Sequence, residues 1–434
     1  METDNYVNWF RNTSPYINAH REKVFVIAIP GDGVADPHFE NFIYDLALLN
    51  SLEVRIVLVH GARLQIDERL KAKGITPRFH KMHRITDRDS LECIQEAISS
   101  VRVTIESQLS MGLVNSPMHG SRIRVMSGNL VTARPRGVVD GVDFELTGLV
   151  RRIDRKMIQM LLDQNVIVLM SSLGFSPTGE VFHLAYEDVA AETAIALQAE
   201  KLVFFTADDG IRDENNEIVR ELEPSEIEPL ATRYEDIDVD IARQLRHAYK
   251  ACSNHIRRVH FISYEREGAM IEELFTRDGN GTLLSEEKFE HLSQATIDDV
   301  GGILELIAPL EEKGILVHRS RERLETEIGQ FAVVKRDGMI VACAALYPFP
   351  EDQTGELACV VVHPEYRGRG SILVDHFEKK ARSMGLKTLF VLTTHTAHWF
   401  IERGYAPAAI ENLPGKKKAL YNYQRNSKIF IKTL

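Results

Sequence analysis

Short apolar runs alternate with helical patterns from Lys23 to about Leu284, and this alternation constrains the fold more than any other feature of the chain. The runs Val24 to Ile29, Val54 to Val59 and Val166 to Met170 are short and apolar, and helical periodicity follows each of them. Strands that alternate with helices form a mostly parallel sheet covered on both faces. Gly137 to Arg152, with its turn residues, predicts a hairpin excursion from this pattern. We therefore expect one α/β domain over residues 23–284.

The pattern changes after Leu284, which indicates a second domain. Residues 285–294 are polar and charged, and we expect them to form a linker. From Ala295 onward, strand-like and helical segments mix in a different order, and the run Glu356 to Val362 is nearly all apolar. We expect residues 295–434 to form a compact α+β domain. A chain of 434 residues is too long for one core of ordinary size, which agrees with two domains.

Residues 1–22 carry aromatic side chains at near-helical spacing ahead of the first strand. An arm with such a face needs a surface to cover, either its own domain or a neighbouring subunit. Of the two, we expect a contact with another subunit.

Composition restricts the class of partner. The net charge of −11 argues against a nucleic-acid-binding protein, because such proteins neutralise phosphates with basic side chains. The N-terminal segment lacks the apolar core of a signal peptide, and no run approaches the roughly 18 apolar residues of a membrane span. The four cysteines are scattered without zinc-ligand spacing, which is typical of reduced thiols. We expect a cytoplasmic protein with no metal, no nucleic acid and no membrane partner.

The run Glu356 to Val362 is followed by a loop that favours anion binding. Near-continuous apolar residues behind one acidic residue are typical of a buried strand, and Pro364 ends it. The loop Tyr366 to Gly370 contains glycines and two arginines, Arg367 and Arg369, and an amphipathic helix pattern follows directly. Backbone N–H groups at a helix N-terminus bind anions, so this segment predicts a pyrophosphate site. The alternative is an ordinary strand, turn and helix with solvated arginines.

This strand, loop and helix resemble motif A of the GNAT fold, the family of CoA-dependent N-acetyltransferases. Arg367 and Gly370 fit the family's Arg/Gln-x-x-Gly-x-Gly/Ala loop, whereas Ile372 stands where Gly or Ala is expected. The resemblance implies acetyl-CoA as co-substrate, with its pyrophosphate on the loop and its thioester on a bulged strand. The residues implied to bind acetyl-CoA are Val360, Val361, Val362, Arg367, Gly368, Arg369 and Gly370.

The first domain resembles the amino-acid kinase fold. Val24 to Gly33 sits where that family's first strand enters a glycine loop, and Val59 to Ala62 resembles its second such loop. Those kinases carry a lysine before a Gly-Gly pair, placed to neutralise the transferring phosphate. In this chain the residues ahead of the glycine loop are Ala28, Ile29 and Pro30, so the lysine is absent. We interpret the domain as a former catalytic fold that is kept for binding.

The sequence also suggests what this domain binds. Amino-acid-kinase domains of arginine biosynthesis often bind arginine as a feedback inhibitor, beside a segment that resembles Gly268 to Thr282. A guanidinium needs a carboxylate fork, which Glu273 offers. An α-carboxylate needs backbone donors, which Gly279, Gly281 and Thr282 offer. The alternative is a solvated helix face followed by a plain turn.

Both domains, in this order, resemble the bacterial N-acetylglutamate synthase family along the whole chain. Similar segments include Val57 to Asp67, Met126 to Asn129, Gly137 to Phe144 and Asn422 to Ser427. The resemblance implies transfer of acetyl from acetyl-CoA to the α-amine of L-glutamate, the first step of arginine biosynthesis, with L-arginine as effector. It also implies a homo-oligomeric ring, such as a hexamer. A fused N-acetylglutamate kinase and an amino-acid sensor without activity are the alternatives.

Attack of an amine on acetyl-CoA needs a proton acceptor, because an amine is mostly ammonium at pH 7. Glu356 is the candidate, directly or through a water, and partial burial would raise its pKa towards neutrality. A backbone N–H near Cys359 to Val361 would stabilise the thioester oxygen. Relatives in the fold use a tyrosine to protonate the thiolate, but Phe400 stands at that position, so Thr393 is the replacement candidate. As alternatives, Glu356 is a solvated strand end and Thr393 an ordinary strand residue.

Glutamate brings two carboxylates, and arginine binds them better than lysine because its guanidinium is bidentate. The glutamate contacts that the resemblance implies are Arg319, Arg425, Ser427, Val317 and Cys359. Cys359 has no evident histidine partner, and direct transfer needs no acyl-cysteine. Lys416 to Lys418 either contact CoA phosphates or lie in water, and they stay unassigned.

Overall fold

The computed structural model describes residues 2–111, 118–276, 278–285, 290–336, 339–364, 366, 368–419, 421 and 427–434. The chain divides into two compact units, Met1–Glu287 and Lys288–Leu434. Each unit contains its own hydrophobic core. The division falls inside residues 285–294, where the sequence predicts a linker.

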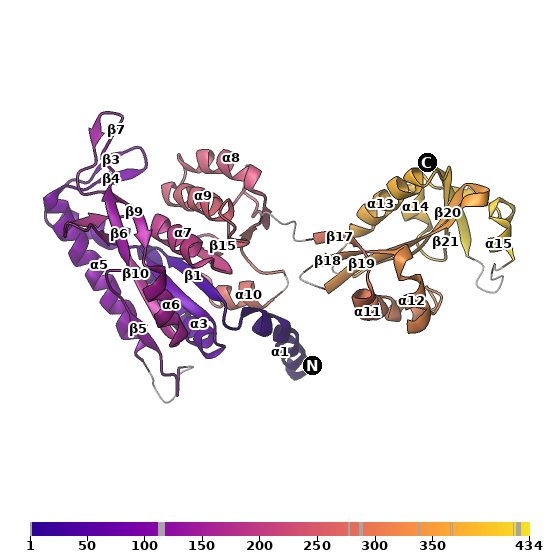
Figure 1. Cartoon of the computed structure of the whole chain (residues 1–434), viewed down its shortest axis with the longest axis horizontal. Coiled ribbons are helices and arrows are strands. Elements are labelled where there is room, and N and C mark those ends of the chain that lie inside the picture. The colour runs from indigo at the N-terminus through magenta and orange to yellow at the C-terminus, as the bar shows by residue number, and fades with distance from the viewer. Residues whose placement is uncertain are drawn as a thin grey trace. The chain divides into compact units, whose positions relative to one another are not determined.

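Within the described residues, the first unit is built on an eight-stranded sheet (Figure 1). In spatial order the strands are β14 (Glu221–Leu222), β16 (Thr282–Leu284), β15 (Arg258–Ser263), β13 (Lys201–Thr206), β1 (Val24–Ile29), β2 (Arg55–His60), β10 (Val166–Ser171) and β5 (Arg124–Met126). Neighbours pair in parallel, except that β16 runs antiparallel to β15. The central strands are buried on both faces, which explains their nearly continuous apolar sequences.

Helices cover both faces of this sheet. They are α1 (Glu2–His20), α2 (Gly31–Ala35), α3 (Phe39–Ser51), α4 (Arg63–Ala72), α5 (Arg88–Leu109), α6 (Arg155–Asp163), α7 (Tyr186–Leu197), α8 (Pro224–Tyr234), α9 (Val239–Cys252) and α10 (Ala269–Phe275). Successive strand residues point to opposite sides, so Phe25 and Ile27 share a core with α3 and α5. Val26 and Ala28 share the other core with α7 and α9. The predicted α/β fold with a mostly parallel sheet is confirmed.

Short strands gather at one end of this unit, where Figure 1 labels β3, β4 and β7. They are β3 (Arg78–His80), β4 (His83–Ile85), β6 (Val131–Pro135), β7 (Val138–Val139), β8 (Val142–Asp143), β9 (Gly148–Ile153), β11 (Leu173–Phe175) and β12 (Val181–His183). Strands β7 and β8 form a hairpin within the predicted excursion Gly137 to Arg152, whereas the later part of that segment is β9, which pairs with β6. The hairpin's turn residues Asp140 and Gly141 have φ angles of 52° and 78°, as a two-residue hairpin turn requires.

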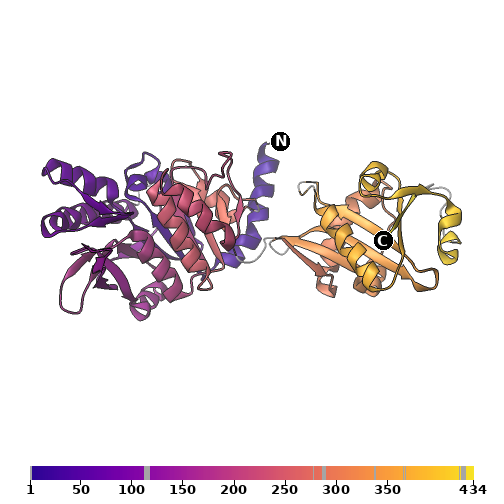
Figure 2. The same ribbon diagram turned by 90° about the horizontal axis from the view of Figure 1, so that it is seen from above.

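The N-terminal arm is the helix α1, which Figure 2 shows in indigo at the edge of the first unit. Tyr16 and Ile17 pack against the core, and His20 Nε2 lies 2.7 Å from the carbonyl oxygen of Leu274. Earlier in the helix, the Phe10 side chain is 59% exposed. The last turns of the arm therefore cover their own unit, and an apolar side chain nearer the N-terminus faces solvent.

The second unit is built on a sheet with the spatial order β17 (Glu290–Gln294), β18 (Phe331–Arg336), β19 (Met339–Phe349), β20 (Thr354–Val362), β21 (Thr388–Thr393), β23 (Lys428–Thr433) and β22 (Ala406–Ala408). Its strands pair antiparallel, apart from the parallel pair of β20 and β21. The first of these strands differs from the sequence expectation, since residues 290–294 were predicted to be linker. Leu292 packs against the core and the segment pairs with β18, so tertiary contacts order a sequence that is mostly polar.

Helices lie on both faces of this sheet as well, as Figure 1 shows. On one face are α11 (Val300–Glu312) and α12 (Arg321–Glu327), and on the other are α13 (Arg369–Ser383) and α14 (Ala397–Ile401). A short helix, α15 (Gly415–Lys418), precedes β23. Short 3-10 turns occupy Ile297–Asp299, Ile328–Gln330, Pro350–Asp352 and Ile410–Asn412. This is the predicted α+β arrangement. Across the described ranges, no helix is long and apolar enough to span a membrane.

Candidate active site

Strands β20 and β21 separate after a short paired segment. Their register covers Thr354, Gly355 and Glu356, whereas β20 continues to Val362. On its other edge β20 pairs with β19. Between the pairs Ala345–Ala358 and Cys343–Val361, β20 advances by three residues while β19 advances by two, so β20 contains one extra residue. Cys359, with φ of 51°, lies at this bulge. A bulge takes a backbone group out of the ladder, so the expected bulged strand is present at residues 359–361.

Glu356 lies where β20 and β21 separate, and it is only 7% exposed. The Lys417 ammonium on α15 lies 2.6 Å from Glu356 Oε2, so the carboxylate is held in a buried ion pair. The sequence analysis left Lys417 unassigned. No local signal separates it from the lysines on either side, because its contact is with a strand far away in sequence.

Thr393 ends β21, next to the strand that carries Glu356, and its side chain is buried. Its Oγ1 accepts a hydrogen bond from the backbone N–H of Thr396 at 3.1 Å and lies 2.8 Å from Thr396 Oγ1. Phe400, which replaces the tyrosine of other relatives, is buried in α14 against Trp399 and Tyr405. A buried hydroxyl is thus available at Thr393 and not at position 400.

Arg319 lies near the bulge of β20. Its Nη1 donates to the carbonyl of Val317 at 3.2 Å, and its backbone N–H donates to Glu311 Oε1 at 3.0 Å. Burial acts to lower the pKa of Arg319, but nearby Cys359 and Tyr347 outweigh burial and raise it. The structure therefore brings Arg319, Val317 and Cys359 together, as the sequence analysis expects of a carboxylate site.

The thiols of Cys343 and Cys359 face the same core. Cys343 Sγ donates to the carbonyl oxygen of Cys359 at 3.8 Å. A hydrogen bond from the Cys343 thiol lowers the pKa of Cys359, and the Arg319 guanidinium acts in the same direction. Arg319 and Cys359 are thereby electrostatically linked.

The remaining predicted residues of this unit are only partly described. Arg367 and Arg425 lie outside the described residues. Ser427 is buried, and its carbonyl accepts a hydrogen bond from Tyr421 Oη at 2.8 Å. Gly368 caps α13 with φ of 94°, a conformation that favours glycine, and Arg369 begins the helix.

The packing around the loop explains one of its glycines. A Cβ on Gly370 would lie 2.9 Å from the ring of Trp399, so a larger residue there would displace that ring. Val361 is buried, while Val360 and Val362 are partly exposed. Ile372, which departs from the family pattern, is 45% exposed and so does not fill the loop.

In the first unit, a hydrogen-bond network surrounds Glu273 and includes one of the other predicted regulatory residues, Gly281. Glu273 Oε1 lies 2.6 Å from His260 Nδ1, and Oε2 accepts the backbone N–H groups of Asn280 and Gly281 at 2.7 and 2.9 Å. Burial alone would raise the pKa of Glu273, but His260 and these backbone donors lower it to about 2. Both carboxylate oxygens are therefore already hydrogen-bonded within the chain.

The neighbours of Glu273 are equally constrained. A Cβ on Gly279 would lie 2.3 Å from Glu273 Oε2, and one on Gly281 would lie 2.2 Å from the carbonyl oxygen of Phe261. Thr282 Oγ1 donates to the carbonyl of Val219 at 2.6 Å and accepts from Ile211 N–H at 2.8 Å.

Two residues that the sequence analysis missed extend this network. Lys201 Nζ lies 3.2 Å from His260 Nε2, and both side chains are buried. Burial and the Lys201 charge lower the pKa of His260 to about 4. Strands β13 and β15 are neighbours in the sheet, which brings these residues together, and no sequence spacing indicates the pair.

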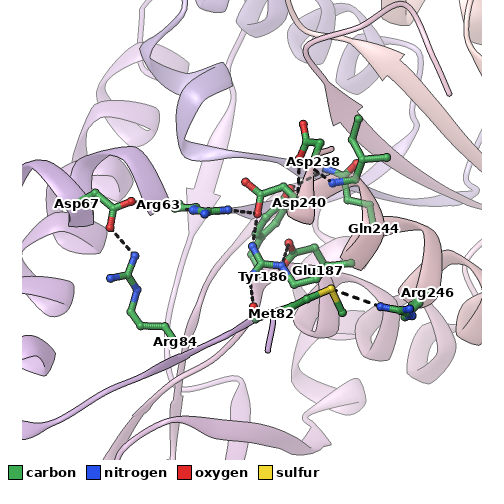
Figure 3. Close-up of polar contacts among 12 residues, drawn as sticks. Arg63, Asp67, Met82, Arg84, Tyr186, Glu187, Asp238, Asp240, Gln244 and Arg246 are labelled. Atoms are coloured by element: carbon green, nitrogen blue, oxygen red, sulfur yellow. Dashed lines mark hydrogen bonds and ion pairs between the residues drawn. The ribbon is translucent and has the colours of Figure 1, made fainter. Parts of the chain in front are cut away.

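The first unit also contains a cavity of about 400 Å³ beside the loops that follow β1 and β2. Arg63 and Asp240, which Figure 3 labels, are among the residues that line it. Asp240 accepts hydrogen bonds from Arg63 at 2.5 Å and from Arg243. Arg243 Nε also donates to the buried Glu187 at 3.2 Å. These two arginines are thus neutralised by carboxylates of the chain, and Pro30 lines the cavity at the approach where kinases carry a lysine.

Two family profiles match the chain, each within one unit. The Amino acid kinase family matches residues 23–263, and the Acetyltransferase (GNAT) family matches residues 302–405. The profiles and the two folds define the class of protein: an acetyltransferase domain that follows an amino-acid-kinase domain.

Full-length relatives specify the class further. The amino-acid acetyltransferases of Pseudomonas syringae pv. syringae and Pseudomonas putida are 56% and 57% identical, with 99% of this chain and 99% of each relative covered. A crystal structure of N-acetylglutamate synthase from Neisseria gonorrhoeae, complexed with coenzyme A and L-arginine, matches with a TM-score of 0.90 at 37% identity and 99% coverage of both chains. This chain therefore belongs to the amino-acid acetyltransferase family, which confirms the resemblance drawn from sequence.

Proposed function

We propose that this protein transfers the acetyl group of acetyl-CoA to the α-amine of L-glutamate and releases N-acetyl-L-glutamate, the first step of arginine biosynthesis. The observation that carries the proposal is the bulged strand β20, with buried Glu356 at the point where β21 separates from it. A second structure of the Neisseria gonorrhoeae relative, 38% identical over 99% of both chains and with a TM-score of 0.63, is complexed with coenzyme A and N-acetyl-glutamate. That relative supports both the co-substrate and the product.

In the proposed reaction, Glu356 accepts a proton from the α-ammonium of the substrate, directly or through one water. The free amine attacks the thioester carbonyl carbon, and a backbone N–H of the bulge at residues 359–361 stabilises the charge on the oxygen. The carbon–sulfur bond then breaks and the acetyl group stays on nitrogen. The nitrogen gives up its remaining extra proton, which passes through Thr393 Oγ1 to the departing thiolate of CoA, so the hydroxyl ends neutral. The transfer is direct, so no acyl-enzyme forms.

Substrate selection in this proposal depends on carboxylate recognition. Arg319, Arg425 and Ser427 bind the carboxylates of glutamate, and main-chain groups of Val317 and Cys359 line the site. The short distance from Arg319 to the Val317 carbonyl and the charge coupling of Arg319 to Cys359 support this grouping. The pyrophosphate of acetyl-CoA binds at Arg367 to Gly370, ahead of α13.

We also propose that L-arginine binds at Glu273, Gly279, Gly281 and Thr282 and inhibits the transfer. The arginine-bound relative supports an effector of this kind. In this chain both oxygens of Glu273 already accept hydrogen bonds, from His260 and from the donors at 280–281, so a guanidinium adds to these partners or displaces them. A homo-oligomeric ring in the cytoplasm, with contacts through α1, completes the proposal.

The test is the release of CoA from acetyl-CoA by the purified full-length chain, with L-glutamate, L-aspartate or a polyamine as acceptor. We expect release with glutamate alone, and inhibition by L-arginine. Indifference to glutamate contradicts the proposal. Including ATP and N-acetyl-L-glutamate in a parallel reaction measures phosphoryl transfer, which we expect to be absent because Pro30 occupies the approach where kinases carry the lysine.

A further inference from the structure

Lys417 differs sharply from the two lysines beside it on α15. The side chains of Lys416 and of its partner Glu351 are 77% and 83% exposed, and their charged groups lie 3.6 Å apart. Lys418 is exposed as well. Lys417 instead turns inward, is 23% exposed, and approaches Glu356 to 2.6 Å. One lysine of a run of three is therefore used inside the fold, at the carboxylate that the proposed reaction needs.

Stability alone accounts poorly for this pair. Removing two charges from water costs free energy that their attraction barely repays, so a buried ion pair is weak evidence for a stabilising role. If Glu356 takes a proton from the substrate, Lys417 needs a different anion at that moment.

The substrate itself brings such an anion. An α-amino acid carries an ammonium and a carboxylate on the same carbon, so its charges are adjacent and opposite, like those of Lys417 and Glu356. When the two pairs lie side by side, each ammonium faces a carboxylate of the other molecule. Every buried charge then has a partner. A buried charge without a partner is the costly arrangement, and it is avoided here.

We propose that Lys417 binds the α-carboxylate of the amino-acid substrate while Glu356 receives its α-ammonium, so that this buried pair recognises the zwitterion. The inference rests on the proposed function, because it takes Glu356 as the proton acceptor. Cys359 lies further along β20 than Glu356, and Arg319 is close to Cys359. Arg319 can then bind the side-chain carboxylate of glutamate. Lys417 is thus a residue that determines specificity for α-amino acids over simple amines.

The experiment compares Lys417→Met with the wild-type full-length chain on two acceptors. L-Glutamate has the α-carboxylate, and L-isoglutamine has a neutral amide in its place. A hydrogen bond between charged groups contributes enough that we expect kcat/KM for glutamate to fall on the order of 10- to 100-fold in Lys417→Met. For isoglutamine we expect a change of less than about 3-fold, because its amide offers no charge to Lys417.

Three controls make the outcome decisive. L-Glutamine keeps the α-carboxylate and loses only the side-chain charge, so Lys417→Met should lower kcat/KM for glutamine by the same factor as for glutamate. Lys417→Arg keeps a cation and should recover part of the loss, which also tests folding. Lys416→Met removes an exposed neighbour and should leave both acceptors unchanged. If wild type does not acetylate isoglutamine, the inhibition constant of isoglutamine, measured in competition with glutamate, replaces kcat/KM. We expect this constant to be the same in wild type and in Lys417→Met.

Equal losses on glutamate and isoglutamine would overturn the inference, since a residue that only positions Glu356 or supports the fold affects both acceptors alike. No loss on either acceptor would overturn it as well. Failure of the proposed function gives a different result, because wild type itself would then show no transfer to glutamate.

Discussion

Two buried glutamates, one in each unit, differ in how their charge is held. Glu273 is hydrogen-bonded at both oxygens, by His260 and by two backbone N–H groups of a glycine turn. Glu356 has the flexible ammonium of Lys417 at one oxygen and lies where two strands separate. Rigid backbone donors fix a carboxylate as an anion, whereas a flexible ammonium can be exchanged for another cation. The difference separates a carboxylate that is fixed within the fold from one whose cation can be exchanged, which the proposed reaction requires of Glu356.

The largest expected effect comes from replacing the exchangeable carboxylate. Glu356→Gln keeps the size of the side chain but cannot accept the proton, so kcat/KM for glutamate should fall by about 10²- to 10⁴-fold. Steady-state CoA release measures this, with circular dichroism to show that the fold persists. A fall of less than about threefold would remove Glu356 from the proposed role and abolish the contrast with Glu273.

Glu273→Gln should act chiefly on stability. The pKa of Glu273 is lowered from 4.5 to about 2, so the folded state binds its proton less readily than the unfolded state does. The resulting stabilisation is present in full above pH 4.5 and is lost as pH falls towards 2, and it is on the order of 3 kcal/mol.

Urea unfolding at pH 7 and at pH 3 measures this effect on the first unit. Glu273→Gln should lower the free energy of unfolding at pH 7 and reduce the loss on acidification. Glu228→Gln is the matched control, because Glu228 forms an exposed pair with Arg246 and such pairs contribute about 0–1 kcal/mol. Similar unfolding free energies for the two variants would mean that Glu273 is not held as described.

A smaller effect should separate two glycines of the same segment. Gly279 and Gly268 both have positive φ, 58° and 70°, so alanine at either position is strained by about 1–2 kcal/mol. Only at Gly279 would the new Cβ approach Glu273 Oε2, whereas nothing lies within 4 Å at Gly268. Gly279→Ala should therefore be more destabilising than Gly268→Ala by about 1–2 kcal/mol. Equal melting shifts would show that the turn does not constrain Glu273.

The same contrast shows which features a sequence reveals. Strand β20, its leading acid and the helix after it follow from a local apolar run and a local periodicity, so they were predictable. Lys417 was not, because a buried ion pair between distant segments leaves no pattern in either segment. Residues 290–294 were assigned to a linker for a related reason: β17 lies at the edge of its sheet, is mostly polar and is ordered by its pairing with β18.

The turn at 279–282 illustrates a further limit. Its glycines predict backbone donors, which we expected to bind the carboxylate of a ligand. In the structure the donors of Asn280 and Gly281 serve Glu273, a carboxylate of the same chain. Donor geometry can be predicted from glycine content, but its acceptor depends on tertiary structure.

The most direct test of the account is a crystal structure of the wild-type chain with coenzyme A and L-glutamate. We predict that the α-nitrogen of glutamate lies about 2.6–3.2 Å from a carboxylate oxygen of Glu356, or one water away. The Lys417 ammonium should have moved to the α-carboxylate, and Glu273 should keep its internal partners. An α-nitrogen distant from Glu356, with the Lys417–Glu356 pair intact, would contradict the account.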